Sequence, residues 1–177
     1  SGGDSENRFW NSTAKSEPFR PLRERYGAGY EAFLREKIAV VDGDVTSPEL
    51  GLAPAVTARI AAEADLVINC SGKVDFNPPL ETSLRVNVTG TQHTLEFTRK
   101  LRRPAYVHPS TCFVVGNRSG EIPEDEPLEG YFPNQGKEGW PAFDPDEEIL
   151  WCERLSVRVR EEAADRLQEA KFRETAV

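Results

Sequence analysis

Three short apolar runs alternate with segments of helical periodicity, and this alternation constrains the fold more than any other feature of the sequence. The runs lie at residues 37–42, 65–70 and 105–115. Strands that are buried on both faces appear as unbroken apolar runs, which is typical of parallel sheets covered by helices. The sequence therefore predicts an α/β fold with a parallel sheet.

Helices are expected between and after these runs. They are predicted over residues 21–36, 54–64, 80–101 and 144–174. The last has the clearest start, because Asp144 can cap its first turn and Pro145 suits its first position. Its apolar stripe comprises Cys152, Leu155, Val159, Ala163, Leu167 and Ala170. We divide the chain into a polar lead-in with a helix (1–36), a partial Rossmann-like core (37–127) and a loop with a long amphipathic helix (128–177).

Composition excludes several classes of function. The chain has 177 residues and a net charge of −8, with no basic stripe that could follow a phosphate backbone, so no nucleic-acid partner is expected. No apolar run approaches the roughly 20 residues that span a bilayer. Cys70, Cys112 and Cys152 are widely spaced and fit neither a disulfide framework nor a metal site. They favour a reducing, cytoplasmic compartment.

The letters Gly27-Ala-Gly-Tyr-Glu-Ala32 match a dinucleotide-binding fingerprint, but their setting does not. That fingerprint works when a strand precedes it, because the turn then delivers a pyrophosphate to the start of a helix. Here residues 23–26 precede it, and they are charged and helical in character. We expect no cofactor role for this segment.

Two turns that follow apolar runs are better candidates for cofactor contacts. In the first, Asp44 could accept a hydrogen bond from an exocyclic amine while Val45 packs on a flat ring; the alternative is that Asp44 only closes an Asx turn. In the second, the small residues Ser71 and Gly72 would let a cofactor approach the backbone closely, unless they form an ordinary turn between a strand and a helix.

Three further polar sites stand out. Ser110 and Thr111 lie at the expected carboxyl end of the third run, where open α/β sheets bind ligands, although hydroxyls also end strands merely to satisfy the turn. Asn87 is unfavourable in the middle of a helix, so it either braces a neighbouring loop or occupies an exposed position. His108 is interpreted as a packed, hydrogen-bonded histidine rather than a catalytic one.

Taken in order, these segments resemble the extended short-chain dehydrogenase/reductase superfamily. The closer resemblance is to the alcohol-forming fatty acyl-CoA reductases and thioester reductase domains, the male-sterility family. The segments that carry it are Gly43-Asp-Val-Thr-Ser-Pro-Glu-Leu-Gly-Leu52, Asp65-Leu-Val-Ile-Asn-Cys-Ser-Gly-Lys-Val-Asp-Phe76, Arg85-Val-Asn-Val-Thr-Gly-Thr91 and Val107-His-Pro-Ser-Thr-Cys-Phe-Val114. The resemblance covers about residues 36 to 127.

The resemblance implies NADPH as cofactor and an acyl-CoA or acyl thioester as substrate, which is reduced to an aldehyde or alcohol. By position, Asp44 and Val45 would border the adenine. Ser71 and Gly72 would lie along the cofactor, and Asn87 would brace the site.

The resemblance also implies a catalytic hydroxyl at Thr111, with Ser110 beside it. In such sites the hydroxyl and a tyrosine hold and protonate the developing oxyanion, and a lysine lowers the pKa of the tyrosine. The Tyr-x-x-x-Lys spacing is absent here. The tyrosines are Tyr26, Tyr30, Tyr106 and Tyr131, and the residues four positions on are Tyr30, Leu34, Ser110 and Gln135.

The glycine-rich first turn of such a domain is missing as well, and the chain contains no methionine. We therefore expect an internal fragment that is inactive alone, with a sheet that lacks strands of the usual order. Exposed strand edges would then favour self-association.

Two other functions stay open from the sequence. One is a nucleotide-sugar epimerase or dehydratase of the same superfamily, although the Leu-Gly-Leu segment and the loop expected over 117–142 favour the acyl reductase. The other is a non-enzymatic interaction module, for which the long final helix and the missing catalytic set are the support.

Overall fold

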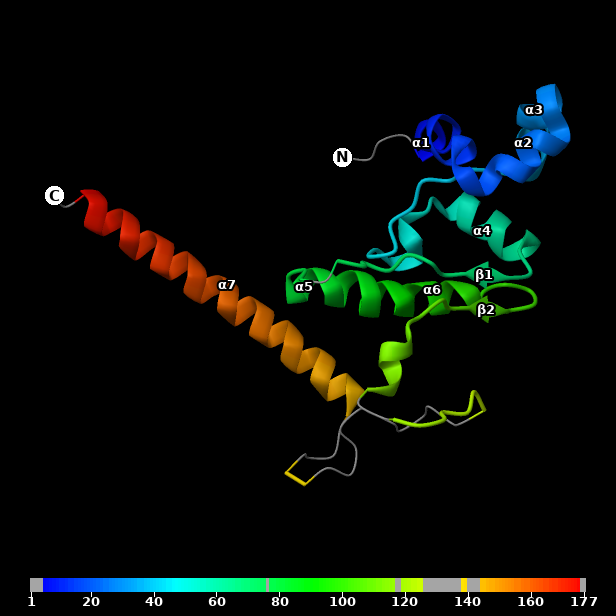
Figure 1. The fold of residues 1–177 in the computed structure, drawn as a ribbon. Coiled ribbons are helices and arrows are strands. Elements are labelled where there is room, and N and C mark those ends of the chain that lie inside the picture. Colours follow the sequence, from blue (N-terminus) through cyan, green and yellow to red (C-terminus); the bar gives the residue numbers. More distant parts are fainter. Residues whose placement is uncertain (1–4, 76, 117–118, 126–137, 140–143, 176–177) are drawn as a thin grey trace.

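The computed structural model describes residues 5–75, 77–116, 119–125, 138–139 and 144–175, and it shows helices arranged around one short parallel sheet (Figure 1). The α-helices are α1 (Ser5–Asn11), α2 (Arg20–Tyr26), α3 (Tyr30–Lys37), α4 (Pro54–Glu63), α5 (Leu80–Ser83), α6 (Gly90–Thr98) and α7 (Pro145–Thr175). The strands are β1 (Val67–Ile68) and β2 (Tyr106–Val107). The fold is therefore mixed helix and parallel sheet, and the three-part division of the chain stays a prediction.

The sheet consists of β1 and β2, which pair in parallel with Val67 opposite Tyr106. Its ladder includes the amide of Val67 donating to the carbonyl of Ala105 at 2.9 Å and the amide of Asn69 donating to that of Val107 at 2.9 Å. Because parallel strands point the same way, the segments that follow β1 and β2 leave the sheet at one common edge. This edge positions the candidate site.

The first apolar run, residues 37–42, was expected to be a strand, and that expectation is wrong. Ile38 has extended backbone angles (φ −124°, ψ 123°) where α3 ends. An extended run becomes a strand only when a neighbour takes its backbone hydrogen bonds. Within the described ranges the sheet contains β1 and β2 alone, so this run has no ladder partner.

The third run, residues 105–115, is a strand only at its beginning. β2 ends at Val107, and residues Cys112–Val115 form a 3₁₀ turn instead. Pro109 lacks the N–H that a ladder needs, so the strand does not continue beyond it. The Ser110-Thr111 pair therefore lies beyond a strand rather than at its last residues.

The expected helices are found, with two interruptions. The helix expected over 21–36 is divided into α2 and α3 at Gly27, whose φ of +50° is incompatible with a regular helix. The segment expected over 80–101 is helical from α5 to α6, with the π-helical stretch Leu84–Thr89 between them. The helix expected over 144–174 is confirmed as α7, and Asp144 Oδ1 accepts from the amides of Asp146 at 2.9 Å and Glu147 at 3.2 Å.

The core is small and divided. Near the amino terminus, Ala14 and Leu34 are buried, and Tyr30 donates to the carbonyl of Ala14 at 2.6 Å. A second group on α6 and just after it buries Phe97 and Leu101.

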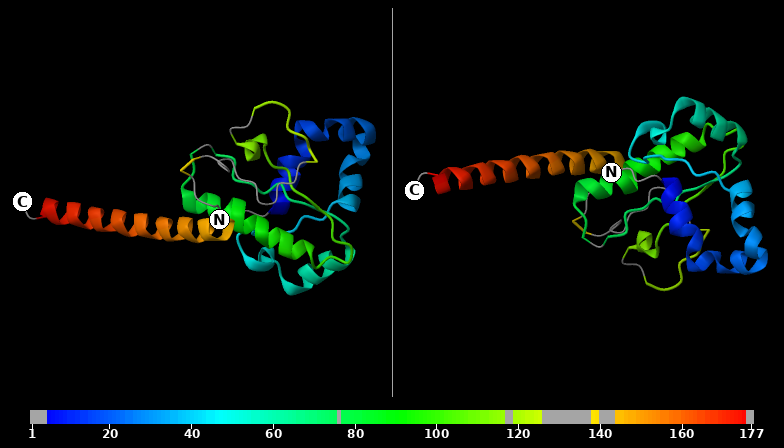
Figure 2. Two further views of the ribbon diagram at one scale, coloured as in Figure 1. Left: turned by 90° about the horizontal axis from the view of Figure 1, so that it is seen from below. Right: turned by 90° about the horizontal axis from the view of Figure 1, so that it is seen from above.

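The long helix α7 leaves the rest of the molecule as a straight rod (Figures 1 and 2). It contacts α5, where Arg160 forms an ion pair with Glu81, and Cys152 and Leu155 of its apolar stripe are partly covered. Farther along, Leu167 is 63% exposed. Most of the loop expected over 117–142 lies outside the described residues.

Candidate functional site

The turn after the first apolar run is closed by Asp44. Its Oδ1 accepts from the backbone amide of Thr46 at 2.9 Å and from the Thr46 hydroxyl at 2.8 Å, and its Oδ2 accepts from Ser47 at 3.2 Å. The Thr46 side-chain and backbone hydrogen bonds hold the pKa of Asp44 below its usual value, so the carboxylate is ionised at neutral pH. The structure thus shows the Asx turn. The role of Asp44 at an adenine stays a prediction.

The same loop is backbone-strained a few residues later. Glu49, Leu50 and Gly51 all have positive φ, at 56°, 58° and 63°. Left-handed angles at non-glycine residues cost about 1–3 kcal/mol each and persist only where the surroundings enforce them. Here the amide of Asp44 donates to the carbonyl oxygen of Leu50 at 2.7 Å, and Gly43 allows the close approach, because a Cβ there would stand 3.0 Å from that oxygen.

The loop is anchored on α6. Val45 faces Gly90, where a Cβ would meet the Val45 Cγ2 at 3.2 Å. The ring of His93 places Nδ1 at 3.0 Å from the carbonyl oxygen of Val45, and Glu49 forms an ion pair with Lys100. The structure therefore places Val45 half-buried against a helix, with its predicted adenine contact untested.

The second turn is held by Asn87 from the π-helical stretch. Asn87 Oδ1 accepts from the backbone amide of Lys73 at 2.6 Å, and its Nδ2 donates to the Lys73 carbonyl at 3.2 Å. Gly72 lies beside this clamp, because a Cβ there would be 3.8 Å from Asn87 Oδ1. A π-helical stretch offsets the helix locally and is frequent at functional sites. Asn87 thus fixes the backbone of the turn that contains Ser71 and Gly72.

Thr111 begins the 3₁₀ turn Cys112–Val115. Its Oγ1 accepts from the backbone amide of Phe113 at 3.1 Å, which orients the hydroxyl. A hydroxyl that accepts one hydrogen bond can still donate its own proton. Ser110 and Thr111 are both exposed.

A buried amide that the sequence analysis missed connects the two strands. Asn69 Oδ1 accepts from the amide of Ser71 at 3.1 Å and from its hydroxyl, while Nδ2 lies 2.9 Å from the hydroxyl of Tyr106 and 3.5 Å from Nδ1 of His108. His108 is hydrogen-bonded as expected, but its ring is exposed and stacks on Tyr106 rather than being packed in a core. The signal available was a lone polar residue in an apolar run, because buried polar groups need partners.

These contacts bring some candidate residues together and leave others apart. The turns that contain Ser71-Gly72 and Ser110-Thr111 leave the sheet at one edge and are linked through Asn69. Within the described parts of the chain, no hydrogen bond or ion pair joins Asp44 to either turn. The arrangement thus offers two exposed hydroxyls and a small-residue turn at the carboxyl edge of a parallel sheet, the usual ligand position in α/β folds.

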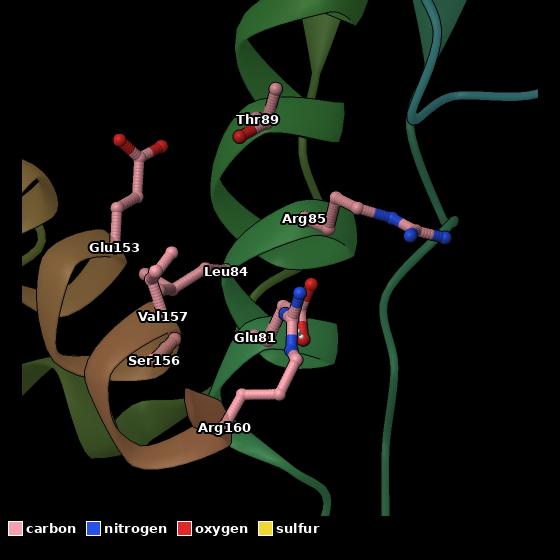
Figure 3. Close-up of a pocket in the computed structure, with 8 residues that line it drawn as sticks. All are labelled: Glu81, Leu84, Arg85, Thr89, Glu153, Ser156, Val157 and Arg160. Carbon is pink, nitrogen blue, oxygen red and sulfur yellow. Dashed lines mark ion pairs between the residues drawn. The ribbon is translucent and has the colours of Figure 1, made fainter. Parts of the chain in front are cut away.

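A separate cavity of about 200 Å³ lies between α5 and α7 (Figure 3). Leu84 and Val157 face each other across it, and Arg160 forms an ion pair with Glu81 at one end. Arg85 points away from it toward the neighbouring chain segment. None of the predicted site residues lines this cavity.

Comparison with known protein families shows which family this chain belongs to. Residues 1–172 match the model of the male sterility protein family, an NAD-binding family. The chain belongs to the male sterility family. A nicotinamide dinucleotide is thereby supported as the cofactor class of the domain.

The curated relatives that this chain matches are named as reductases. It is 32% identical over 119 residues to the alcohol-forming fatty acyl-CoA reductase of Simmondsia chinensis, covering 66% of this chain and 24% of that protein. It is 30% identical over 118 residues to the chloroplastic fatty acyl-CoA reductase 2 of Arabidopsis thaliana, covering 66% and 19%. With fatty acyl-CoA reductase 1 of Gallus gallus it shares 28% identity over 85 residues, covering 48% and 16%.

The chain therefore matches about a quarter or less of the length of these curated relatives. The resemblance seen in the sequence is confirmed at the level of the family. Across the described residues, no helix has both the length and the apolar character needed to cross a membrane.

Proposed function

We propose that this chain is part of a reductase that uses NADPH to reduce fatty acyl-CoA or a related acyl thioester to an aldehyde or alcohol. The observation that carries the proposal is the edge of the β1–β2 pair, where the Ser71-Gly72 turn and the Ser110-Thr111 hydroxyls emerge together. Family membership and the names of the relatives support this chemistry. The sheet would be a partial Rossmann-like sheet, which the other strands of such a domain would complete.

The residues present fit a dinucleotide. The turn has the small residues Ser71, which is partly exposed, and Gly72, which is exposed, and Asn87 clamps the backbone of the next residue, Lys73. A ligand could therefore approach the turn closely. Asp44 supplies an ionised carboxylate that could accept from an adenosine amine or hydroxyl. When bound, the cofactor supplies the hydride that converts the acyl carbonyl to an aldehyde as the CoA thiol leaves.

The chain's own contribution to that chemistry would be the hydroxyl pair. Thr111, with Ser110 beside it, would hold the acyl carbonyl oxygen as negative charge develops there, which is where positioned donors accelerate acyl transfer. None of the tyrosines has a lysine four residues on. We therefore propose that these 177 residues alone are catalytically inactive.

A direct test compares the full-length protein that carries this sequence with the 177-residue chain. Oxidation of NADPH is followed with a long-chain acyl-CoA, with NADH as the alternative donor, and products are identified by mass spectrometry. We expect turnover by the full-length protein and none by the chain. Absence of acyl-CoA reduction in the full-length protein would overturn the proposed function, and turnover by the chain would overturn its inactivity.

We also propose a cytoplasmic location, because the cysteines indicate a reducing compartment. Cys70, Cys112 and Cys152 are all unpaired thiols in the structure, which suits a reducing compartment. Fractionation of cells that produce a tagged protein would test it, and recovery in an oxidising compartment would contradict it.

A further inference from the structure

The buried polar side chains of the described residues are Asn69, Thr94 and Thr98, and Asn69 differs from the two threonines in its partners. Thr94 and Thr98 satisfy their hydroxyls on carbonyls of their own helix, at Gly90 and Thr94. Asn69, only 5% exposed, bonds instead to residues of two chain segments far apart in sequence. A buried polar network of this kind fixes a unique arrangement when every member is satisfied.

The orientation of the Asn69 amide follows from its partners. The backbone amide of Ser71 can only donate, so the side-chain atom facing it at 3.1 Å must be the oxygen Oδ1. The NH₂ group of Asn69 then faces Tyr106 and His108. Because that group can only donate, its hydrogen bond to Nδ1 of His108 at 3.5 Å requires the ring proton of His108 on Nε2.

The second histidine supplies an internal reference. Nδ1 of His93 lies 3.0 Å from the carbonyl oxygen of Val45. A carbonyl oxygen can only accept, so His93 must carry its proton on Nδ1. The chain has two histidines, and the structure assigns them opposite tautomers.

The network joins the two turns of the candidate site. On one side it holds Ser71, next to Gly72. On the other it holds His108, and Pro109 restricts both its own φ and the backbone of His108. The strand register and the contact with Asn69 thus place His108, which lies three residues before Thr111, with Pro109 restricting the backbone between them.

We propose that Asn69 is a positioning residue, which sets the Thr111 hydroxyl relative to the Ser71-Gly72 turn by tying His108 to Ser71. This inference rests on the proposed function for its catalytic consequence. Asn69 is not a catalytic residue, because it is buried beneath the two turns. His108 acts through the acceptor at Nδ1 and performs no proton transfer.

The structural half is tested by nitrogen NMR on the full 177-residue chain. We expect His108 in the Nε2–H form and His93 in the Nδ1–H form. Asn69→Asp replaces the donating NH₂ by an acceptor, so the ring signals of His108 and the amides of Ser71, Ser110 and Thr111 should shift while His93 stays unchanged. Thr98→Val, an isosteric change at an equally buried polar side chain, is the matched control and should leave all of these signals in place.

The catalytic half is tested on the full-length protein. Asn69→Asp and His108→Leu should lower kcat about 10- to 100-fold, because a misplacement of about 1 Å can cost about 100-fold. KM for the acyl-CoA should change little, since neither residue touches the substrate. His108→Asn keeps an acceptor where Nδ1 stands and should retain most of kcat, as should Thr98→Val.

Each outcome decides the proposal. It is overturned if His108 is in the Nδ1–H form in the unaltered chain, if Asn69→Asp leaves the amides of Ser110 and Thr111 unmoved, or if His108→Asn loses as much kcat as His108→Leu. If the full-length protein reduces no acyl-CoA at all, the proposed function fails, and the NMR measurements alone decide whether Asn69 positions Thr111.

Discussion

At the scale of single residues, exposed side chains of the candidate site also hold the backbone. Asp44 and Thr111 each accept a hydrogen bond from a main-chain amide, of Thr46 and Phe113, within their own turn. Such a bond aims the acceptor atom without burying it. A substitution at either residue therefore changes both a local turn and the atom presented to a ligand, and conservative pairs of variants are needed to separate the two effects.

Thr111→Val keeps the shape of the side chain and removes the hydroxyl. We expect it to lower kcat of the full-length reductase by about 100-fold or more, because a positioned proton donor contributes about 10²–10⁴-fold. Thr111→Ser restores the hydroxyl and should recover most of the rate, whereas Ser110→Ala should have a smaller effect. Steady-state kinetics with acyl-CoA measure all three; full activity of Thr111→Val would remove the residue from the chemistry.

Asp44→Asn should reduce the loss of unfolding free energy at acid pH. The pKa of Asp44 is lowered in the folded chain, first of all by its hydrogen bond with the Thr46 side chain. The stabilisation is therefore fully present above the ordinary aspartate value of about 3.9 and is lost as the pH falls through the lowered folded value. Urea denaturation between about pH 2 and pH 6 should show a shallower acid loss for the variant. Parallel curves for the two proteins would contradict the assignment.

At the scale of elements, the helical segment from α5 to α6 organises the site. Its π-helical stretch presents Asn87 to the second turn, and the first loop is anchored by Gly90 of α6 and by Lys100, which lies just after α6. One helix therefore fixes two turns that are distant in the sequence. Substitutions on the faces of this helical segment that contact the turns should therefore displace the turns, even where no site residue is altered.

Gly90→Val tests this coupling. A Cβ at Gly90 already stands 3.2 Å from Cγ2 of Val45, and the further methyls of valine would displace the loop. Overpacking of this kind costs about 1–3 kcal/mol. Gly29→Ala is the matched control: nothing lies within 4 Å of an added Cβ there and its φ is −83°, so its free energy of unfolding should be unchanged or higher. Equal stability of Gly90→Val and the unaltered chain in denaturant titration would show that the loop moves freely.

Prediction from the sequence succeeded where local signals are strong. Asp144 and Pro145 marked the start of α7, whereas the break at Gly27 between α2 and α3 was not predicted. It failed where structure depends on a partner: residues 37–42 have strand composition but no neighbouring strand among the described residues. Asn69 could be noticed as a lone polar residue in an apolar run, but its partners Tyr106 and His108 lie on the other strand and could not be predicted from that run.

At the scale of the whole molecule, apolar surface remains on the sheet. Leu66, Ile68 and Val107 are all exposed, with Ile68 at 59%. Short sheets with open edges and apolar faces are templates for association. The core offers little to compensate, because few apolar side chains of the described residues are buried: Ala14, Leu34, Phe97 and Leu101.

Self-association of the 177-residue chain is the expected result. Light scattering over a concentration series should show a mass that rises with concentration. Ile68→Lys places a charge on the exposed face and should reduce the association, whereas a lysine at Leu167 on α7, which is equally exposed but distant from the sheet, should not. A constant monomer mass at high concentration would contradict the expectation.

Although α7 is straight, its contacts with the rest of the molecule decrease along its length. Residues 161–168 are all exposed, so beyond the Arg160–Glu81 ion pair the helix is supported by little more than its own hydrogen bonds. Isolated helical segments shorter than about 12–15 residues are marginal in water. Deuterium uptake should therefore rise steadily along α7 from Leu155 outward. A protease would make its first cuts in that outer half while the turns at the sheet edge were still intact.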